Sequence, residues 1–419
     1  MKKKYLTSII CITLSLVQTS YAKNFLTYFN AAQHNDNTLL NQYAQYHAAI
    51  DNVDIARASL LPSINFTSNY NISSNSHGFT SYGLSLSQTL LNIPSWSGYN
   101  GAKLSEKAAY YQTLSAWQDL CERYVEAYLA QAQAQVTLRL DQQSQRITRN
   151  LYRLTQRKFK AGQIKSTDVS TVYTSLLSSQ STILTDRQTL ATKQNNLEII
   201  THSPLLKADE LISNLPLVAP KSKQLQQWQK KALSMNPALK AAHFTSLSSK
   251  QNILSAEAGH IPTLSLTANY NGDDTPTTSH TSAGISLSLP LFSGFKTTAQ
   301  TRQAQQNYIA QYQTEKLAIQ KLMAQTKTAY QHLFYDIKLI QSARKTLRAA
   351  KRAYQNNLIT YKSGFLDITS LLNAKQTVDQ QQLSFIEKKY NYVLQIILLR
   401  QSIGALGKPD IVNLSYWLK

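Results

Sequence analysis

Long apolar runs, cysteine, glycine and proline are all scarce in this chain of 419 residues. After residue 22, no apolar run approaches the ~20 residues that a membrane-spanning helix requires. If the protein enters a membrane, we therefore expect it to do so with β-strands. The only cysteines are Cys11 and Cys121, and Cys11 lies in a predicted leader, so we expect no disulfide within the mature chain.

The first 22 residues have the pattern of an export signal. Three lysines precede an apolar stretch from Leu6 to Val17, and a suitable cleavage site follows at Ala22. The apolar stretch is too short to cross a bilayer as a helix. We predict that residues 1–22 are a signal peptide and that the mature chain begins at Lys23. A retained anchor is the alternative.

Patterns for catalysis and metal binding are also lacking. The eight histidines form no His-Glu-x-x-His pair and no Cys/His cluster. The chain has no P-loop, no Gly-x-Ser-x-Gly and no dinucleotide fingerprint. We predict that the protein is not an enzyme and uses neither a cofactor nor a metal. His77 and His280 fall in two predicted surface loops, where we expect them to be solvated.

Acidic residues are few, and the 43 Lys and Arg against 22 Asp and Glu give a net charge of +21. Without the three leader lysines the basic count falls from 43 to 40 and the charge to +18. A nucleic-acid partner would suit this balance, but an exported chain rarely meets nucleic acid and the charges are scattered. We predict no nucleic-acid partner and favour a solvated helical surface facing anionic envelope components.

Glycine and proline are absent from four long stretches that are rich in good helix formers. At 1.5 Å per residue the longest two would extend roughly 90 and 100 Å. Apolar residues recur every seven positions along 169–197 and 371–399, which indicates a coiled coil or helical barrel. Core packing in an ordinary bundle would show the same spacing. The four stretches are 102–161, 163–203, 296–363 and 365–403.

Shorter helices would complete a cylinder wall. Residues 163–203 and 36–59 would span roughly 60 and 35 Å, which together match one long helix. We therefore expect short helices to stack end to end beside the long ones. The Pro-bearing stretch 205–221 and the tail after Gly404 would lie outside this wall as a belt.

The chain repeats its own pattern at an offset of 196 to 202 residues, which indicates an internal duplication. We predict a first repeat over 23–220, with helices at about 97–203. A second repeat would cover 221–408, with helices at about 295–403, and a short tail would follow over 409–419. The matched landmarks are Pro62 with Pro262, Tyr70 with Tyr270, Gly98 with Gly294, and Gly162 with Gly364.

Four uncharged segments alternate apolar and polar residues with a period of two. Such alternation suits strands between lipid and water, although a half-buried soluble sheet would read similarly. Four strands cannot close a barrel, and open edges are not tolerated in lipid, so the chain must oligomerise. Three copies would supply twelve strands, which favours a homotrimer. The predicted strands are about 61–73, 79–92, 262–272 and 280–292.

Over residues 23–408 the chain resembles the TolC family of outer-membrane efflux and secretion ducts. The motifs that carry the resemblance are AEAGHIPTL at 256–264, LSLPLFSG at 287–294, YNY at 390–392 and SIGALG at 402–407. The resemblance implies a homotrimeric twelve-stranded outer-membrane β-barrel, with four strands per protomer, continuous with a long periplasmic α-helical barrel. A periplasmic coiled-coil adaptor or scaffold without a membrane barrel is the alternative.

The resemblance also implies a function and partners. The protein would be a passive exit duct of a tripartite efflux pump or a type I secretion system, located in the outer membrane with a large periplasmic extension. It would contact outer-membrane lipid and dock to a periplasmic adaptor (a membrane fusion protein) and an inner-membrane transporter.

In the same family, helices around the two glycine turns close the periplasmic end. Asp168 matches an aspartate that ties back to a tyrosine before the second turn, and Tyr361 is the matching tyrosine. A helix-capping role for Asp168 is the alternative. Ser370 and Asn373 stand where drug-efflux relatives carry an acidic ring. We therefore predict a constriction of these four residues that is neutral or favours anions.

The tips of the two turns would face the adaptor. The first turn lacks the Gly-Leu-x-Ala tip of ducts that dock drug-pump adaptors, and several lysines make both turns basic. The predicted adaptor-facing residues are Gly162, Gln163, Ile164, Lys165, Gly364, Phe365 and Leu366.

Overall fold

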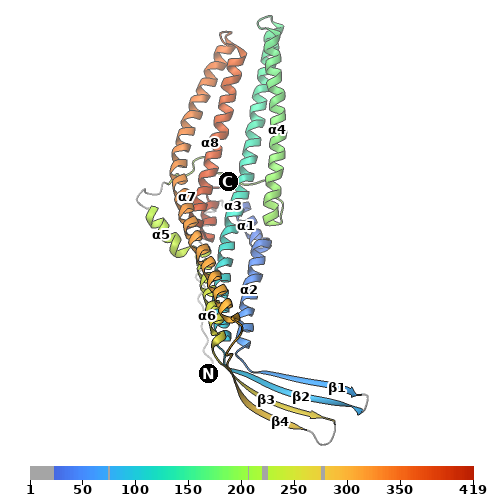
Figure 1. The fold of residues 1–419 in the computed structure, drawn as a ribbon. Helices are drawn as coiled ribbons and strands as arrows, with labels where there is room; N and C mark the ends of the chain where they lie inside the picture. The colour runs from blue at the N-terminus through green and yellow to red at the C-terminus, as the bar shows by residue number, and fades with distance from the viewer. Residues whose placement is uncertain (1–22, 74–75, 206, 219–224, 275–278) are drawn as a thin grey trace, which may run out of the picture.

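Two long helical hairpins stand beside each other, and a small sheet projects from the opposite end of the molecule (Figure 1). The computed structural model describes residues 23–73, 76–205, 207–218, 225–274 and 279–419. The predicted signal peptide lies outside the described residues. One hairpin joins α3 (Ile93–Lys160) to α4 (Ser166–Thr201), and the other joins α7 (Lys296–Lys362) to α8 (Ile368–Ser402). Three of these helices, α4, α7 and α8, coincide closely with stretches that lack glycine and proline, and α3 extends beyond its stretch at the start.

The two halves of the chain have the same order of elements. In the first half, α2 (Asn37–Ala58), β1 (Ser63–Ser73) and β2 (Ser76–Leu91) precede the first hairpin. In the second half, α6 (Pro237–Glu257), the 3₁₀ turn η2 (Ala258–His260), β3 (Thr263–Asp273) and β4 (His280–Ser288) precede the second hairpin. This correspondence is what a duplication predicts.

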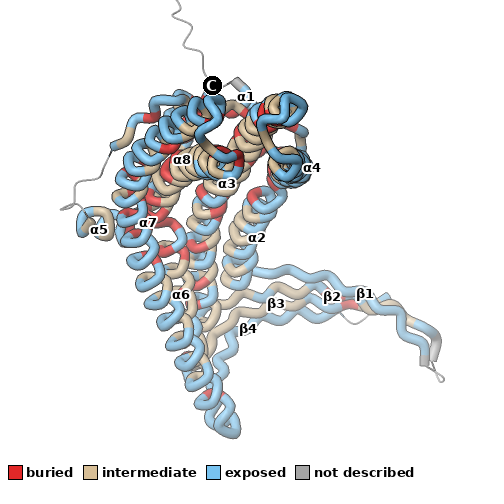
Figure 2. Tube along the Cα trace, turned by 90° about the horizontal axis from the view of Figure 1, so that it is seen from above, coloured by how far each residue is buried: buried red, intermediate tan, exposed pale blue. Residues whose placement is uncertain are grey.

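The short helices line the long ones as expected. Both α2 and α4 pack along α3, and both α6 and α8 pack along α7. In Figure 2, viewed from above, α7, α8, α3 and α4 follow one another along an arc. Among the residues described, we find no helix with both the length and the apolar character needed to cross a bilayer.

The sheet separates apolar from polar side chains cleanly. Its strands are antiparallel in the order β1-β2-β3-β4. Because Ile64 faces Leu86 and Leu84 faces Tyr270, the apolar residues of neighbouring strands share one face. That face is open in the single chain, where Ile64 and Ile72 are 64% and 77% exposed. The predicted alternation is confirmed.

Two strand ends differ from the prediction. β4 ends at Ser288, four residues early, because Pro290 has no amide hydrogen with which to continue the ladder. β2 begins at Ser76, three residues early. As a result His77 lies within β2 and His280 opens β4, so the prediction that both lie in surface loops is wrong.

α3 begins at Ile93, four residues before the predicted start of the helices at about 97 and nine before the stretch that lacks glycine and proline. The Asn92 side chain accepts a hydrogen bond from the Ser95 amide (3.2 Å), and Pro94 occupies the first turn. Proline is tolerated there because the first helical amides have no partner within the helix. Capping at Asn92 therefore starts the helix before Gly98 and Gly101, which lie inside it.

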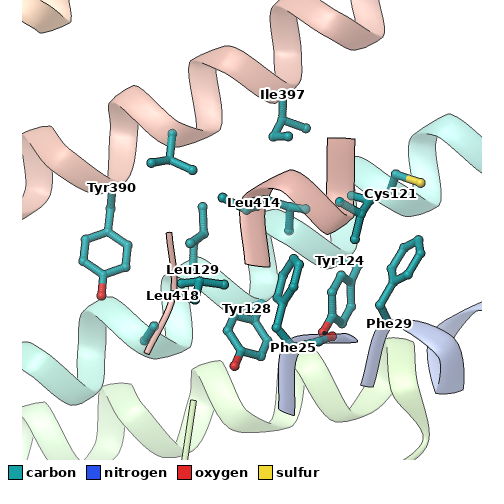
Figure 3. Close-up of a cluster of buried hydrophobic side chains, with 14 of the residues drawn as sticks. Phe25, Phe29, Cys121, Tyr124, Tyr128, Leu129, Tyr390, Ile397, Leu414 and Leu418 are labelled. Atoms are coloured by element: carbon teal, nitrogen blue, oxygen red, sulfur yellow. Dashed lines mark hydrogen bonds between the residues drawn. The ribbon is translucent and has the colours of Figure 1, made fainter. Parts of the chain in front are cut away.

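A belt of buried side chains packs against α3 and α8, and part of it is shown in Figure 3. It is built by α1 (Lys23–Asn35), residues 207–218 and α9 (Lys408–Ser415) packing on α3 and α8. The Tyr128 hydroxyl donates to Asp209 Oδ2 (2.9 Å), and a β-bridge joins Leu211 to Leu418. The final residues of the chain are thus part of this belt. Another short helix, α5 (Leu225–Met235), precedes α6.

Candidate functional site at the helix-turn tips

Both hairpins reverse direction through the same turn. Gly162 and Gly364 have φ of +70° and +85°, a region that favours glycine. Each glycine amide donates to the carbonyl three residues back, at 2.9 and 3.1 Å. The next amides, of Gln163 and Phe365, donate to the carbonyl five residues back, also at 2.9 and 3.1 Å. This pattern satisfies the last carbonyls of α3 and α7 without any side-chain cap.

The predicted adaptor-facing residues lie at the far end of the hairpins from the sheet (Figure 1). Most of them are exposed, and Phe365 is 86% exposed. Ile164 and Leu366 are half-buried, and Leu366 packs on a cluster just behind the tips. The tips therefore combine an exposed aromatic ring and exposed lysines with a firmly packed base.

That base is a small apolar cluster that joins the two hairpins. One buried residue comes from α3, one from α4, one from α7 and two from α8. Because each buried aliphatic or aromatic side chain contributes about 1.5–3 kcal/mol, the cluster stabilises the contact between the hairpin ends. Its buried members are Leu151, Val172, Tyr361, Ile368 and Leu371.

Tyr361 forms the polar contact at the centre of this cluster. Its hydroxyl lies 3.1 Å from Thr155 Oγ1, and both side chains are buried. Burial raises the pKa of Tyr361, and the nearby Asp168 carboxylate raises the pKa further. The expected direct hydrogen bond between Asp168 and Tyr361 is not formed in the structure. Thr155 takes that place, because it lies one turn beyond Leu151 on the face of α3 that meets α7.

Lys158 is a second contact that the sequence analysis missed. Its Nζ donates to the backbone carbonyls of Tyr361 (2.9 Å) and Lys362 (3.2 Å), and lies 4.8 Å from the centre of the Tyr361 ring. The end of α3 thereby supplies a cation to the negative end of the α7 dipole. From the sequence, Lys158 contributed only to the basic character of the tip.

The remaining predicted gate residues lie near the starts of α4 and α8. Asp168 is half-buried in the first turn of α4, which has no side-chain cap, so the structure does not support a capping role for it. Asp367 caps α8 instead, accepting from the Ser370 amide (2.8 Å) and the Ser370 hydroxyl (2.6 Å). These bonds lower the pKa of Asp367. Asn373 follows one turn later and is exposed.

Farther from the tips, a polar cluster also joins α3 to α8. The buried Lys375 donates to Asp379 Oδ2 (2.7 Å) and to the Ser144 hydroxyl, which itself donates to Asp379 Oδ2 (2.7 Å). Beside it, burial and the neighbouring Asp186 raise the pKa of Asp141 to about 7. Of these contacts, only the Lys375–Asp379 ion pair has a signal in the sequence, because a spacing of four residues is typical of ion pairs on a helix. In the described part of the chain, no group of three or more His, Cys, Asp and Glu is placed to hold a metal ion.

Residues 29–201 and 228–405 match the model of a family described as outer membrane efflux protein. The chain belongs to the outer membrane efflux protein family. TolC of Vibrio cholerae serotype O1 is 25% identical over 433 residues, which cover 100% of this chain and 99% of that protein. The proteases secretion protein PrtF of Dickeya chrysanthemi is 25% identical, with 98% and 95% covered.

Solved structures share the fold. The Campylobacter jejuni CmeC outer membrane channel matches with a TM-score of 0.82 at 17% identity, covering 94% of this chain and 89% of that one. The fold class predicted from the sequence is confirmed: each protomer carries four antiparallel strands and long periplasmic helices, the arrangement of a trimeric twelve-stranded barrel continuous with a helical barrel. The TolC resemblance is confirmed as well.

As a member of the outer membrane efflux protein family, this protein is an outer-membrane exit duct for efflux or type I secretion, with a large periplasmic helical portion. The family consists of passive channels. TolC-like channels are trimeric and work with efflux or secretion pumps.

Proposed function

We propose that the periplasmic end of this duct is a gate, held shut by the contacts around Tyr361 and opened when the two hairpins separate. The observation that carries the proposal is the position of Tyr361 and Lys158. Both bridge α3 and α7, and so link the two hairpins at their tips. Separating the hairpins breaks these bonds between them. The hydrogen bonds of each turn lie within one hairpin, so they stay intact when that hairpin moves as a rigid unit.

The gate would consist of the four predicted residues together with two that the structure adds. Tyr361 holds the hairpins together through Thr155 and Lys158, and Asp168 sets the charge beside the phenol. Ser370 and Asn373, near the start of α8, would line the constriction. A hydrogen bond of this kind contributes about 1 kcal/mol, and one to a charged donor about 1.5–3 kcal/mol. Docking of a partner can supply such amounts.

We infer that the tips dock to a periplasmic adaptor, which couples the duct to an inner-membrane transporter. The exposed residues of the two turns support this, because they project beyond the packed base. The chain itself would move its cargo passively and catalyse no reaction, since the energy comes from the transporter.

The entrance would be neutral or favour anions. Asp367 is committed to capping α8, and Ser370 and Asn373 supply no charge. Lys165 and Lys362 are exposed at the turns. Reversal potentials of the purified channel in a salt gradient would test this, and clear selectivity for cations would contradict it.

The gate is tested by reconstituting the purified protein in a planar lipid bilayer. Tyr361→Phe removes the hydroxyl that lies 3.1 Å from Thr155 Oγ1 and keeps the ring in the apolar cluster. We expect a larger open fraction in this variant than in the wild type. Equal conductance of the two channels would show that this contact does not hold the hairpins together.

A further inference from the structure

Basic residues are concentrated in the part of the hairpins near the tips, and not evenly scattered as the sequence analysis assumed. Residues 142–186 hold seven Lys and Arg against two Asp, and residues 337–379 hold eight against two. This part of the chain therefore carries about half of the net charge of +21. Neither the gate nor the packing of the hairpins requires so many cations.

On α3 these cations form a stripe along one face. Successive members are three or four residues apart, and such residues lie above one another on a helix. α7 has cations at the equivalent places, judged by the common turn at Gly162 and Gly364: Arg348, Lys351 and Lys362. All of them are exposed. The α3 stripe consists of Arg146, Arg149, Arg153, Arg157 and Lys160.

Within the described residues, the acids of this region are occupied elsewhere. Asp367 caps α8, Asp379 pairs with Lys375, and Asp186 lies beside Asp141. Asp168 is half-buried near Tyr361. No described acid forms an ion pair with a cation of the α3 stripe. Cations stacked three and four residues apart repel one another, so the stripe destabilises the isolated helix. An acidic partner would remove that cost.

The position of the stripe decides what kind of partner fits it. Arg146 lies 53 residues beyond the start of α3, roughly 80 Å along the helix from the sheet, so outer-membrane lipid is out of reach. The stripe also runs for roughly 20 Å along the helix axis. A flat layer of lipid headgroups facing the tips would touch only the turns, whereas a helix lying alongside can follow the whole stripe. A neighbouring copy of the chain presents the same excess of cations and would therefore repel the stripe.

We propose that the stripes bind an acidic helical segment of a partner protein, with Asp or Glu repeated every three or four residues. The inference rests on the proposed docking function and deepens it, because it states the chemistry that the adaptor must carry. Complementary charges at such spacing select a partner and its register, as flanking charges do in coiled coils. A partner that carries neutral or basic residues at these positions would be rejected.

The test uses the full-length channel in detergent and two synthetic helical hairpins that are identical except for Glu or Gln at the stripe-facing positions. We expect fluorescence anisotropy to show binding of the Glu hairpin at least tenfold tighter than the Gln hairpin. Raising the salt concentration from about 50 to 300 mM should remove most of this difference, because exposed charges are screened. Equal binding of the two hairpins would overturn the proposal.

Two variants locate the site. Arg149→Glu with Arg153→Glu should weaken binding of the Glu hairpin at least tenfold, whereas Lys103→Glu with Lys107→Glu, the same charge change near the sheet, should change it less than twofold. Equal losses would overturn the proposal. The proposal would also be overturned if neither hairpin bound the wild type while the wild type bound phosphatidylglycerol vesicles and the stripe variant did not. That result would assign the stripe to lipid. Single-channel conductance of each variant checks that it folds. Equal binding of the two hairpins refutes only the charge proposal, whereas binding of neither hairpin to the wild type also refutes the proposed docking.

Discussion

Replacing Lys158 by Met tests the gate most directly. Methionine keeps the length and apolar stem of the side chain, so its packing on the Tyr361 ring remains. The change removes the charge and the two hydrogen bonds to the carbonyls of Tyr361 and Lys362. We expect a population of separated tips that the wild type lacks, and hence a higher conductance.

The magnitude follows from the two bonds. The bond to Tyr361 is partly buried and charge-assisted, and such bonds contribute about 1.5–3 kcal/mol. The bond to Lys362 is exposed and adds little. A net loss of about 2 kcal/mol per protomer would change the ratio of open to closed tips about 30-fold.

The assay is single-channel conductance in planar bilayers, with the open fraction measured over long recordings. Lys160→Met is the matched control, because Lys160 is exposed two residues away and its loss changes the net charge equally. Thr155→Val should raise the open fraction by less, and Asp168→Asn by least, since Asp168 makes no hydrogen bond to Tyr361. The reasoning fails if Lys158→Met conducts like the wild type, or if Lys160→Met matches it.

Two further substitutions give predictions about stability. The pKa of Asp141 is raised from 3.8 to about 7, so between these pH values the folded protein holds a proton that the unfolded chain has lost, and stability falls as pH rises toward 7. Asparagine cannot ionise, so Asp141→Asn should leave the melting temperature unchanged near pH 4. At pH 8 it should stabilise the folded protein by about 1–2 kcal/mol, a value reduced for partial exposure. An equal effect at both pH values would contradict this. Gly404→Ala should destabilise well beyond the roughly 1–2 kcal/mol expected for Gly162→Ala from its left-handed backbone alone. A Cβ at 404 would lie 2.7 Å from backbone atoms of the neighbouring α5–α6 junction, whereas at 162 it meets nothing within 4 Å. Alkylation of the buried Cys121, whose pKa burial raises to about 12, would report the opening of the belt, and equal rates in the two glycine variants would refute the comparison.

The sequence determined the elements of this fold because each depends on neighbouring residues. Helices run where glycine and proline are missing, and strands where apolar and polar residues alternate without charge. The turns at Gly162 and Gly364 were visible for the same reason, since their positive φ requires glycine. The tips could therefore be located before the structure was known. Pro290 stopped β4 and Asn92 started α3 early, and the predicted tail 409–419 contains most of α9.

Only the tertiary structure decided which side chains meet across the hairpins. Thr155 and Tyr361 are 206 residues apart, and Lys158 lies 203 residues before the first carbonyl it binds. No local pattern indicates such pairs, because each depends on how two helices of about 100 Å rotate and slide against each other. The raised pKa of Asp141 has the same origin, since burial by packed helices and the approach of Asp186 exist only in the folded chain.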